Sequence, residues 1–172
     1  MQPLSSTDEA PTLHMLCGKI GAGKSTLSQQ LASKPRQVLI CEDAWLAALH
    51  PGDIHSIADY LQRAATLRSV LTDHLRALLQ AGVSVVLDFP FNTPVTRAWA
   101  RDLFEPTGAA HRLHFLDVAD EVCKLRLRAR NARGEHPFQA SDEAFEQITR
   151  HFVAPAVEEG FVVMRYTEAG PV

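Results

Sequence analysis

Residues 12–26 read TLHMLCGKIGAGKST, an apolar run that leads directly into a glycine-rich loop. The loop matches the pattern G-x-x-x-x-G-K-[ST], with a predicted strand at 12–17 before it and a predicted helix at 23–33 after it. Glycines let such a loop curl tightly, so that successive backbone N–H groups point inward at phosphate oxygens. The helix that follows offers its N-terminus to the same charge. The stretch therefore predicts a P-loop, the phosphate-binding turn of a nucleotide-binding protein.

The polar residues of this loop have distinct predicted roles. Lys24 is placed to reach the β- and γ-phosphates, the Ser25 hydroxyl is a ligand for Mg²⁺, and Thr26 can contact the α-phosphate. The alternative is a glycine-rich turn that matches by chance, and the flanking strand and helix argue against it. We therefore predict a nucleotide-binding set that consists of Gly18, Gly21, Ala22, Gly23, Lys24, Ser25 and Thr26.

Outward from this loop, apolar strands alternate with helical patterns. Residues 53–81 carry apolar side chains at steps of three and four, which is typical of one long helix or two shorter ones. Such alternation predicts a parallel sheet covered on both faces, in a single α/β domain at 12–172 after a flexible tail at 1–11. The other predicted strands are 37–41, 83–87, 112–118 and 161–166, and the other helices are 94–104, 121–133 and 141 to about 159.

Acidic residues follow two of the predicted strands. Asp88 closes the apolar run VSVVL, so it should lie beside Ser25, because the carboxyl ends of parallel strands share one edge of a sheet. Asp88 is predicted to serve Mg²⁺ or the acceptor, and the alternative is an acid that caps a turn. Glu42 and Asp43 follow the strand at 37–41, where an acid can accept the proton of an attacking hydroxyl. From position alone, Asp43 is equally a base or a helix N-cap.

Three arginines are expected to share one helix face. Arg126, Arg130 and Arg133 are spaced by four and three residues, whereas Lys124 and Arg128 point elsewhere. A face of this kind, followed by a loop, suits a lid around 126–140 that closes over a polyphosphate. The alternative is a solvated basic face paired with acids. The buried stripe beside it is predicted to comprise Val118, Val122, Leu125, Ala129 and Ala132.

Composition excludes several classes of protein. The 172 residues carry a net charge of −3, which argues against a general nucleic-acid footprint. No apolar run approaches the roughly 20 residues of a membrane span, and residues 1–11 lack the pattern of a secretory signal. The three cysteines show no C-x-x-C spacing and are interpreted as core residues of a reducing compartment, so we expect a cytoplasmic protein.

Other motifs give no competing site. The eight histidines contain no H-E-x-x-H, and His111 and His114 should point to opposite faces of one strand. No N-K-x-D that would select guanine is present. Four aromatic residues could line an acceptor pocket, although core packing is their more usual role: Phe89, Phe91, Trp45 and Trp99.

Four blocks together resemble one family. GKIGAGKST, ICEDAW, VVLDFPFN and LRLRARNARG are similar to the small AAA-type P-loop kinases that include zeta-toxin-like proteins, chloramphenicol phosphotransferase and the kinase domain of phage polynucleotide kinase. The resemblance covers nearly all of the chain after residue 11. It implies a five-stranded parallel sheet of order 2-3-1-4-5, ATP with Mg²⁺, Asp43 as the catalytic base, and Arg126 and Arg130 as lid residues. Arg133 is a further expected contact to the nucleotide.

One position departs from this pattern. Several members carry an arginine three residues after the base, where it holds the acceptor, and this chain has Leu46 there. A polynucleotide or another phosphate-bearing acceptor is therefore not favoured. Arg63, Arg68 and Arg97 are possible substitutes, and the segments 44–63 and 89–96 are expected to shape the acceptor pocket.

The sequence thus predicts an ATP-dependent phosphotransferase whose acceptor is an unidentified small hydroxyl compound. Lys24, Asp43, Arg126 and Arg130 are the predicted catalytic residues, and Ser25 and Asp88 are the predicted metal ligands. Two alternatives stay open: an ATP-binding module that controls a protein partner, and a simple nucleotide hydrolase. The sequence indicates neither the acceptor nor the oligomeric state.

Overall fold

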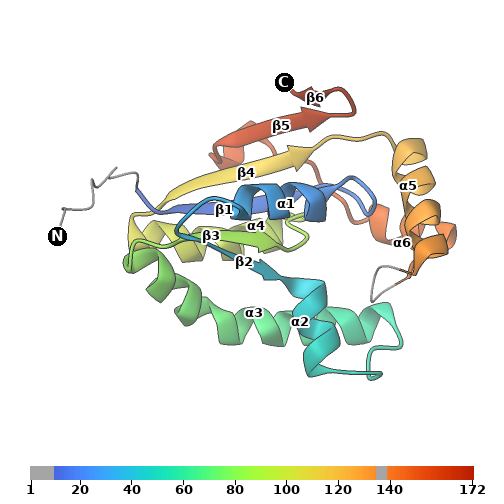
Figure 1. Cartoon of the computed structure of the whole chain (residues 1–172), viewed down its shortest axis with the longest axis horizontal. Helices are drawn as coiled ribbons and strands as arrows, with labels where there is room; N and C mark the ends of the chain where they lie inside the picture. The colour runs from blue at the N-terminus through green and yellow to red at the C-terminus, as the bar shows by residue number, and fades with distance from the viewer. Residues whose placement is uncertain (1–9, 135–138) are drawn as a thin grey trace.

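The computed structural model describes residues 10–134 and 139–172, which form a sheet with helices on both faces (Figure 1). The strands are β1 (Thr12–Cys17), β2 (Gln37–Cys41), β3 (Ser84–Asp88), β4 (Ala110–Leu116), β5 (Val163–Thr167) and β6 (Gly170–Pro171). The helices are α1 (Lys24–Ala32), α2 (Glu42–Leu49), α3 (Ile57–Gln80), α4 (Pro94–Phe104), α5 (Asp120–Arg133) and α6 (Asp142–Thr149), with 3-10 turns at Glu105–Thr107 and Val157–Glu159. None of the helices within these described ranges is both long and apolar enough to cross a membrane.

The sheet has the order β2-β3-β1-β4-β5-β6. Strands β1 to β5 pair in parallel, which confirms the α/β class and the predicted order 2-3-1-4-5. The five-strand count was one short, because the two-residue strand β6 turns back to pair antiparallel with β5. Parallel strands end at a common edge, and this edge faces α2 and α5 (Figure 1).

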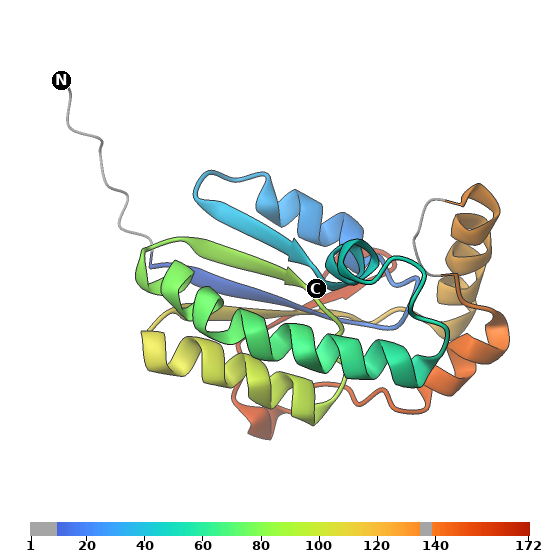
Figure 2. The same ribbon diagram turned by 90° about the horizontal axis from the view of Figure 1, so that it is seen from below.

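Two apolar clusters hold the layers together, one on each side of the sheet. Helices α3 and α4 cover one face, and α1 lies on the other (Figure 2). The larger cluster joins alternate residues of β1 and β3 to the apolar stripe of α3, as the two-residue period of a strand requires. The smaller cluster joins the intervening strand residues to α1, α5 and α6.

Several predicted boundaries were wrong. The long helical pattern is one helix that begins at Ile57, because the Ser56 side chain caps it by accepting a hydrogen bond from the Asp59 N–H. The strands predicted at 112–118 and 161–166 lie two residues earlier and about two residues later, respectively. Residues 1–9 of the predicted tail and 135–138 of the predicted lid lie outside the described residues.

The helix predicted from Ser141 to about Glu159 ends instead at Thr149. Pro155 has no N–H and restricts the residue before it, so an α-helix could not continue through it. The Val153 N–H donates to the Asn92 carbonyl, and the Val153 carbonyl accepts from Arg97. This segment is therefore held extended along the loop that follows β3.

The predicted buried stripe of α5 was also wrong in part. Leu125 is 66% exposed, and Ala129 and Ala132 are exposed as well. Val118 is buried as predicted, and Val122 packs against the smaller core cluster beside Cys123 and Leu127, which are the fully buried residues of α5. This contact is a narrow one, because α5 stands at the end of the sheet and does not lie flat on its face (Figure 1).

Candidate functional site

The glycine-rich loop between β1 and α1 has a conformation that only glycine readily adopts. Gly21 and Gly23 have φ angles of +80° and +106°. A Cβ atom on Gly21 would lie 2.4 Å from the carbonyl oxygen of Cys123, so the loop also packs tightly against α5. Gly23 stands at the N-cap of α1, which leaves the first N–H groups of that helix directed toward the loop.

Lys24 lies between the loop and two carboxylates. Its Nζ donates to the carbonyls of Gly18 at 2.7 Å and Lys19 at 3.0 Å. Burial lowers the pKa of the Lys24 ammonium, and the negative charges of Asp88 and Asp43 oppose that shift. The structure therefore brings together three residues that the sequence placed in one site from separate segments.

The predicted metal ligands present oxygen atoms of the kind that Mg²⁺ prefers. Ser25 is exposed in the first turn of α1, and Asp88 is buried at the end of β3. The described residues contain no group of three or more His, Cys, Asp or Glu side chains that would hold a metal alone. One hydroxyl and one carboxylate fit Mg²⁺, which is usually held by one or two protein ligands, waters and substrate phosphates.

Cys41 lies opposite Asp88 in the register of β2 and β3. Burial, together with the neighbouring carboxylates of Asp88 and Asp43, raises the pKa of the Cys41 thiol to about 11. The thiol therefore stays protonated and can donate a hydrogen bond to Asp88. Cys17 and Cys123 are buried, and all three cysteines are free, in agreement with their interpretation as packing residues.

Asp43 is the second residue of α2 and is not its N-cap, because Cys41 has that position. Glu42 and Asp43 occupy the first turn of α2, where negative charge is favoured by the helix dipole. The hydroxyl of Tyr60 lies 2.8 Å from an oxygen of each carboxylate. Glu42 is fully buried and also forms an ion pair with Arg68 at 3.1 Å.

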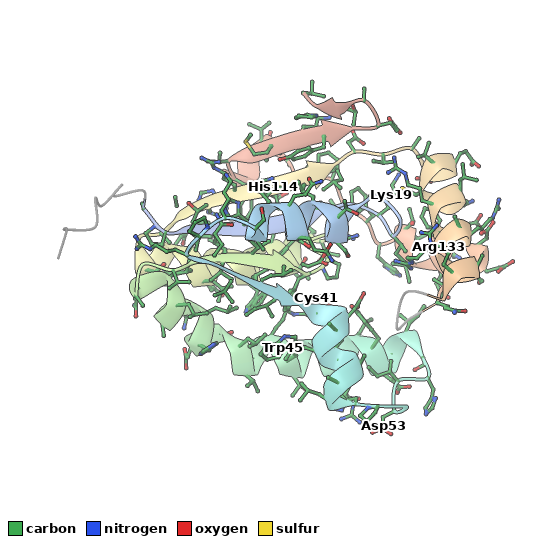
Figure 3. All side chains as sticks on the ribbon, viewed as in Figure 1. Lys19, Cys41, Trp45, Asp53, His114 and Arg133 are labelled. Carbon is green, nitrogen blue, oxygen red and sulfur yellow. The ribbon has the colours of Figure 1, made fainter. Side chains whose placement is uncertain are left out.

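The arginines of α5 divide into two groups. Arg126 donates to the carbonyl of Ala22 in the P-loop at 3.2 Å. Arg130 is half-buried, burial lowers the pKa of its guanidinium, and the charge of Asp43 opposes that shift. Its Nε is buried and has no hydrogen-bond partner among the described residues. Arg133 lies in the last turn of α5, where it is exposed (Figure 3).

The remaining basic residues of α5 pair with α6. Lys124 bonds Glu146 at 2.9 Å, and Arg128 forms a bidentate pair with Asp142. Lys124 and Arg128 therefore point away from the predicted arginine face, whereas Arg126 of that face contacts the P-loop and Arg130 lies within electrostatic range of Asp43.

Two of the proposed substitutes for an acceptor-binding arginine are already engaged. Arg97 is fully buried and bonds Glu159 and the carbonyls of Phe91 and Val153. Arg68 pairs with Glu42 and lies over the Trp99 ring at 6.0 Å. These contacts assign both arginines to structural roles, whereas Arg63 is half-buried on α3.

The aromatic and histidine residues are mostly structural. Phe89, Phe91 and Trp99 pack together in the larger core cluster, but Trp45 is 41% exposed on α2 (Figure 3). His111 stacks on an aromatic ring, with its centroid 4.0 Å from that of Phe104. His114 instead bonds His14 at 3.0 Å and the Tyr166 hydroxyl at 2.8 Å. The two β4 histidines therefore do not converge on a metal.

Sequence reasoning missed two residues of the site, Asn92 and Tyr60. The Asn92 side chain accepts from the Gly18 N–H at 2.9 Å and donates to the Gly18 carbonyl at 3.0 Å. It therefore fixes the start of the P-loop to the loop after β3. The only available signal was its place four residues after Asp88, within the segment expected to shape the acceptor pocket.

Comparisons with known proteins bear on the family and the fold of the chain. The model of the AAA domain family matches residues 13–155. No curated protein sequence shows significant similarity to the chain. Among solved structures, a candidate kinase from Chloroflexus aurantiacus is 22% identical with a TM-score of 0.75, and the match covers 93% of this chain and 86% of that protein.

Two further structures with bound nucleotides share the fold. The APS kinase CysC of Mycobacterium tuberculosis, in complex with AMPPNP and APS, is 22% identical with a TM-score of 0.60, covering 92% of this chain and 89% of that one. Kti12 of Chaetomium thermophilum, in complex with ADP-AlF3, is 13% identical with a TM-score of 0.69, at the same coverages of 92% and 89%. At these identities the likeness establishes the fold.

Proposed function

The chain belongs to the AAA domain family of P-loop, kinase-like proteins, and we propose that it transfers the γ-phosphate of ATP to a hydroxyl group of a small acceptor. The observation that carries this proposal is the position of Asp43. Its charge acts on the pKa values of both Lys24 of the P-loop and Arg130 of α5, so an acid, a P-loop lysine and a further cation lie within electrostatic range of one another. A carboxylate in this position can take the proton of an attacking hydroxyl, and labelled transfer to an acceptor rather than release of free phosphate distinguishes a kinase from a nucleotide hydrolase.

In the proposed reaction, Lys24 and the loop N–H groups hold the β- and γ-phosphates. Asp43 orients the acceptor hydroxyl and takes its proton as the oxygen–phosphorus bond forms and the bond from the γ-phosphorus to the bridging oxygen breaks. Ser25 and Asp88 would hold Mg²⁺, which supplies charge neutralisation on the phosphates. Arg126 and Arg130 stabilise the charge in transfer from the side of α5. Catalysis would consist mainly of positioning and charge stabilisation.

The acceptor is expected to carry no phosphate. Leu46 is fully buried at the position where an acceptor-binding arginine is expected from the resemblance. Arg68 and Arg97 are held by carboxylates and backbone carbonyls, so neither is available to an anionic acceptor. An alcohol, sugar, nucleoside or aminoglycoside without a phosphate group therefore suits this site better than a polynucleotide.

The experiment is ATP turnover with γ-labelled ATP against a panel of alcohols, sugars, nucleosides and aminoglycosides. Asp43→Asn should lower transfer by about 10²–10⁴-fold, the usual contribution of a general base, while ATP still binds. Asp102→Asn is the matched control, because Asp102 is exposed on α4 outside the site, and it should transfer normally. Equal transfer by Asp43→Asn and the wild type would refute the base assignment. Tight ATP binding without transfer to any panel member would favour an ATP-dependent interaction module.

A further inference from the structure

Tyr60 places one hydroxyl between two carboxylates. Its oxygen is 2.8 Å from Glu42 Oε1 and 2.8 Å from Asp43 Oδ1. A phenol has a single O–H, so it donates fully to only one of these acceptors at a time. Both oxygens are within hydrogen-bonding distance, so turning the O–H about the ring–oxygen bond can move the hydrogen bond from one carboxylate to the other.

The two ends of this arrangement differ. Glu42 is 1% exposed, and its second oxygen is held by Arg68 at 3.1 Å. Burial raises the pKa of the Glu42 carboxyl, and the hydrogen bond from Tyr60 and the charge of Arg68 oppose this effect. Asp43 is half-buried at the site and lies close enough to Lys24 and Arg130 to affect both.

The phenol itself remains protonated. Burial raises the pKa of Tyr60, and both adjacent carboxylates raise it further because a phenolate beside them would be a third negative charge. Tyr60 is therefore a permanent donor. It comes from the first turn of α3, whereas both acceptors lie in the first turn of α2, so the hydroxyl also ties the two helices together.

We propose that Tyr60 is a positioning residue that holds Asp43 in place to receive the acceptor proton and then transfers its hydrogen bond to Glu42. This inference rests on the proposed function. Before transfer, the ionised Asp43 accepts the Tyr60 O–H at Oδ1. The acceptor proton then moves to the Asp43 carboxylate as the new oxygen–phosphorus bond forms. The neutral Asp43 is a poorer acceptor, so the Tyr60 O–H turns to the Glu42 carboxylate, and the proton on Tyr60 never leaves it.

Two consequences separate this role from simple packing. A hydrogen bond donated to a carboxylate stabilises its charged form, so removing the Tyr60 hydroxyl should make Asp43 more basic. Losing the bond also removes one restraint on the Asp43 rotamer, which lowers the fraction of molecules in a productive geometry. Among the described residues, the titratable or charged groups that act on this cluster come from several elements and are not altered by the substitution: Lys24, Cys41, Arg68, Asp88 and Arg130.

The first measurement does not need an acceptor. Carboxyl ¹³C NMR titration of aspartate-labelled protein follows Asp43, assigned by its absence in Asp43→Asn. In Tyr60→Phe, the titration midpoint of Asp43 should rise by about one pH unit, the size expected for a lost hydrogen bond to a charged group. Tyr166→Phe is the matched control, since Tyr166 is the only other tyrosine and bonds His114. An unchanged midpoint in Tyr60→Phe would overturn the proposal.

A second measurement covers the case in which Tyr60→Phe does not fold. In Tyr166→Phe, Tyr60 is the only tyrosine, so absorbance near 295 nm reports its ionisation alone. The phenol should stay protonated above pH 10 until the protein unfolds, as a donor between two carboxylates must. Ionisation near pH 10 in the folded protein would contradict the arrangement.

Kinetics with an acceptor from the panel completes the test. Tyr60→Phe should lower kcat about tenfold or more and move the acidic limb of the pH profile upward, while the KM for ATP changes less than twofold. Full activity of Asp43→Asn would refute the proposed base, whatever Tyr60→Phe does. If Asp43→Asn is inactive but the acidic limb of the pH profile of Tyr60→Phe is not shifted, only the proposed role of Tyr60 is refuted.

Discussion

Replacing Arg97 by methionine should destabilise the protein far more than the same change at an exposed arginine–carboxylate pair. Arg97 is fully buried on α4. Its guanidinium donates to both oxygens of Glu159, at 2.6 and 2.8 Å, and to the carbonyls of Phe91 at 3.1 Å and Val153 at 2.9 Å. One side chain thus connects the loop after β3 to the chain segment that follows α6.

The size of the effect follows from this burial. Removing one partner of a buried ion pair typically costs about 3–5 kcal/mol, because the other groups are left without compensation. For a chain of this length, each kcal/mol lowers Tm by about 2–4 °C, so Arg97→Met should lower Tm by roughly 6–20 °C. The matched control is Arg128→Met, because Arg128 forms a bidentate pair with Asp142 but is 63% exposed. Exposed pairs contribute about 0–1 kcal/mol.

Urea unfolding at pH 7, followed by tryptophan fluorescence, measures both variants. Trp99 stacks on the Phe91 ring at 6.0 Å, so its emission reports the region that Arg97 supports. The free energy of unfolding of Arg128→Met should be close to that of the wild type, and that of Arg97→Met should be far lower than both. Equal losses in the two variants, or a loss below about 1 kcal/mol in Arg97→Met, would refute the structural role given to Arg97.

Three further predictions concern the site and the core. Gly21→Ala should lower nucleotide affinity by more than about tenfold in calorimetry, because the added methyl group would lie 2.4 Å from a carbonyl oxygen of α5. Gly52→Ala is the control, since Gly52 has a similar φ of +78° but no atom within 4 Å of an added Cβ, and it should bind normally. Equal affinities of the two variants would contradict the close packing of the P-loop against α5. Asn92→Ala should weaken ATP binding about tenfold, because it removes the two hydrogen bonds between the Asn92 side chain and the backbone of Gly18. An unchanged affinity would show that the P-loop keeps its conformation without Asn92. Burial lowers the pKa values of His14 and His114 to about 4, so the unfolded chain binds more protons as the pH falls, and stability should decrease by about 1.5 kcal/mol per histidine between pH 6.5 and 5. A urea midpoint that stays constant over this range would contradict their burial as neutral groups.

The sequence was sufficient for the features that local chemistry determines. The P-loop spans so few residues that its pattern predicts both the strand before it and the helix after it. Asp88 was placed correctly at a strand end because an apolar run followed by an acid marks that edge of a parallel sheet. The sheet order came from the family resemblance, since strand periodicity alone does not fix the neighbours of a strand.

Long-range contacts explain what the sequence could not predict. Asn92 and Gly18 are separated by 74 residues and Tyr60 and Asp43 by 17, and neither pair forms a recognisable motif. Arg97 is an ordinary charged residue in a helical pattern, and only the folded structure shows that it is buried against Glu159. The helix expected at 141–159 stopped early because a tertiary hydrogen-bond network engages its second half.

The most direct test of the central claim is calorimetric titration of MgATP into the wild type, Lys24→Ala and Lys34→Ala. Lys34 is exposed beyond the end of α1, so its variant controls for the loss of one positive charge. The account predicts binding heat for the wild type and Lys34→Ala with similar affinities, and an affinity at least about tenfold weaker for Lys24→Ala. Absence of heat with the wild type, or equal affinities for all three proteins, would contradict a P-loop that holds the terminal phosphates through Lys24.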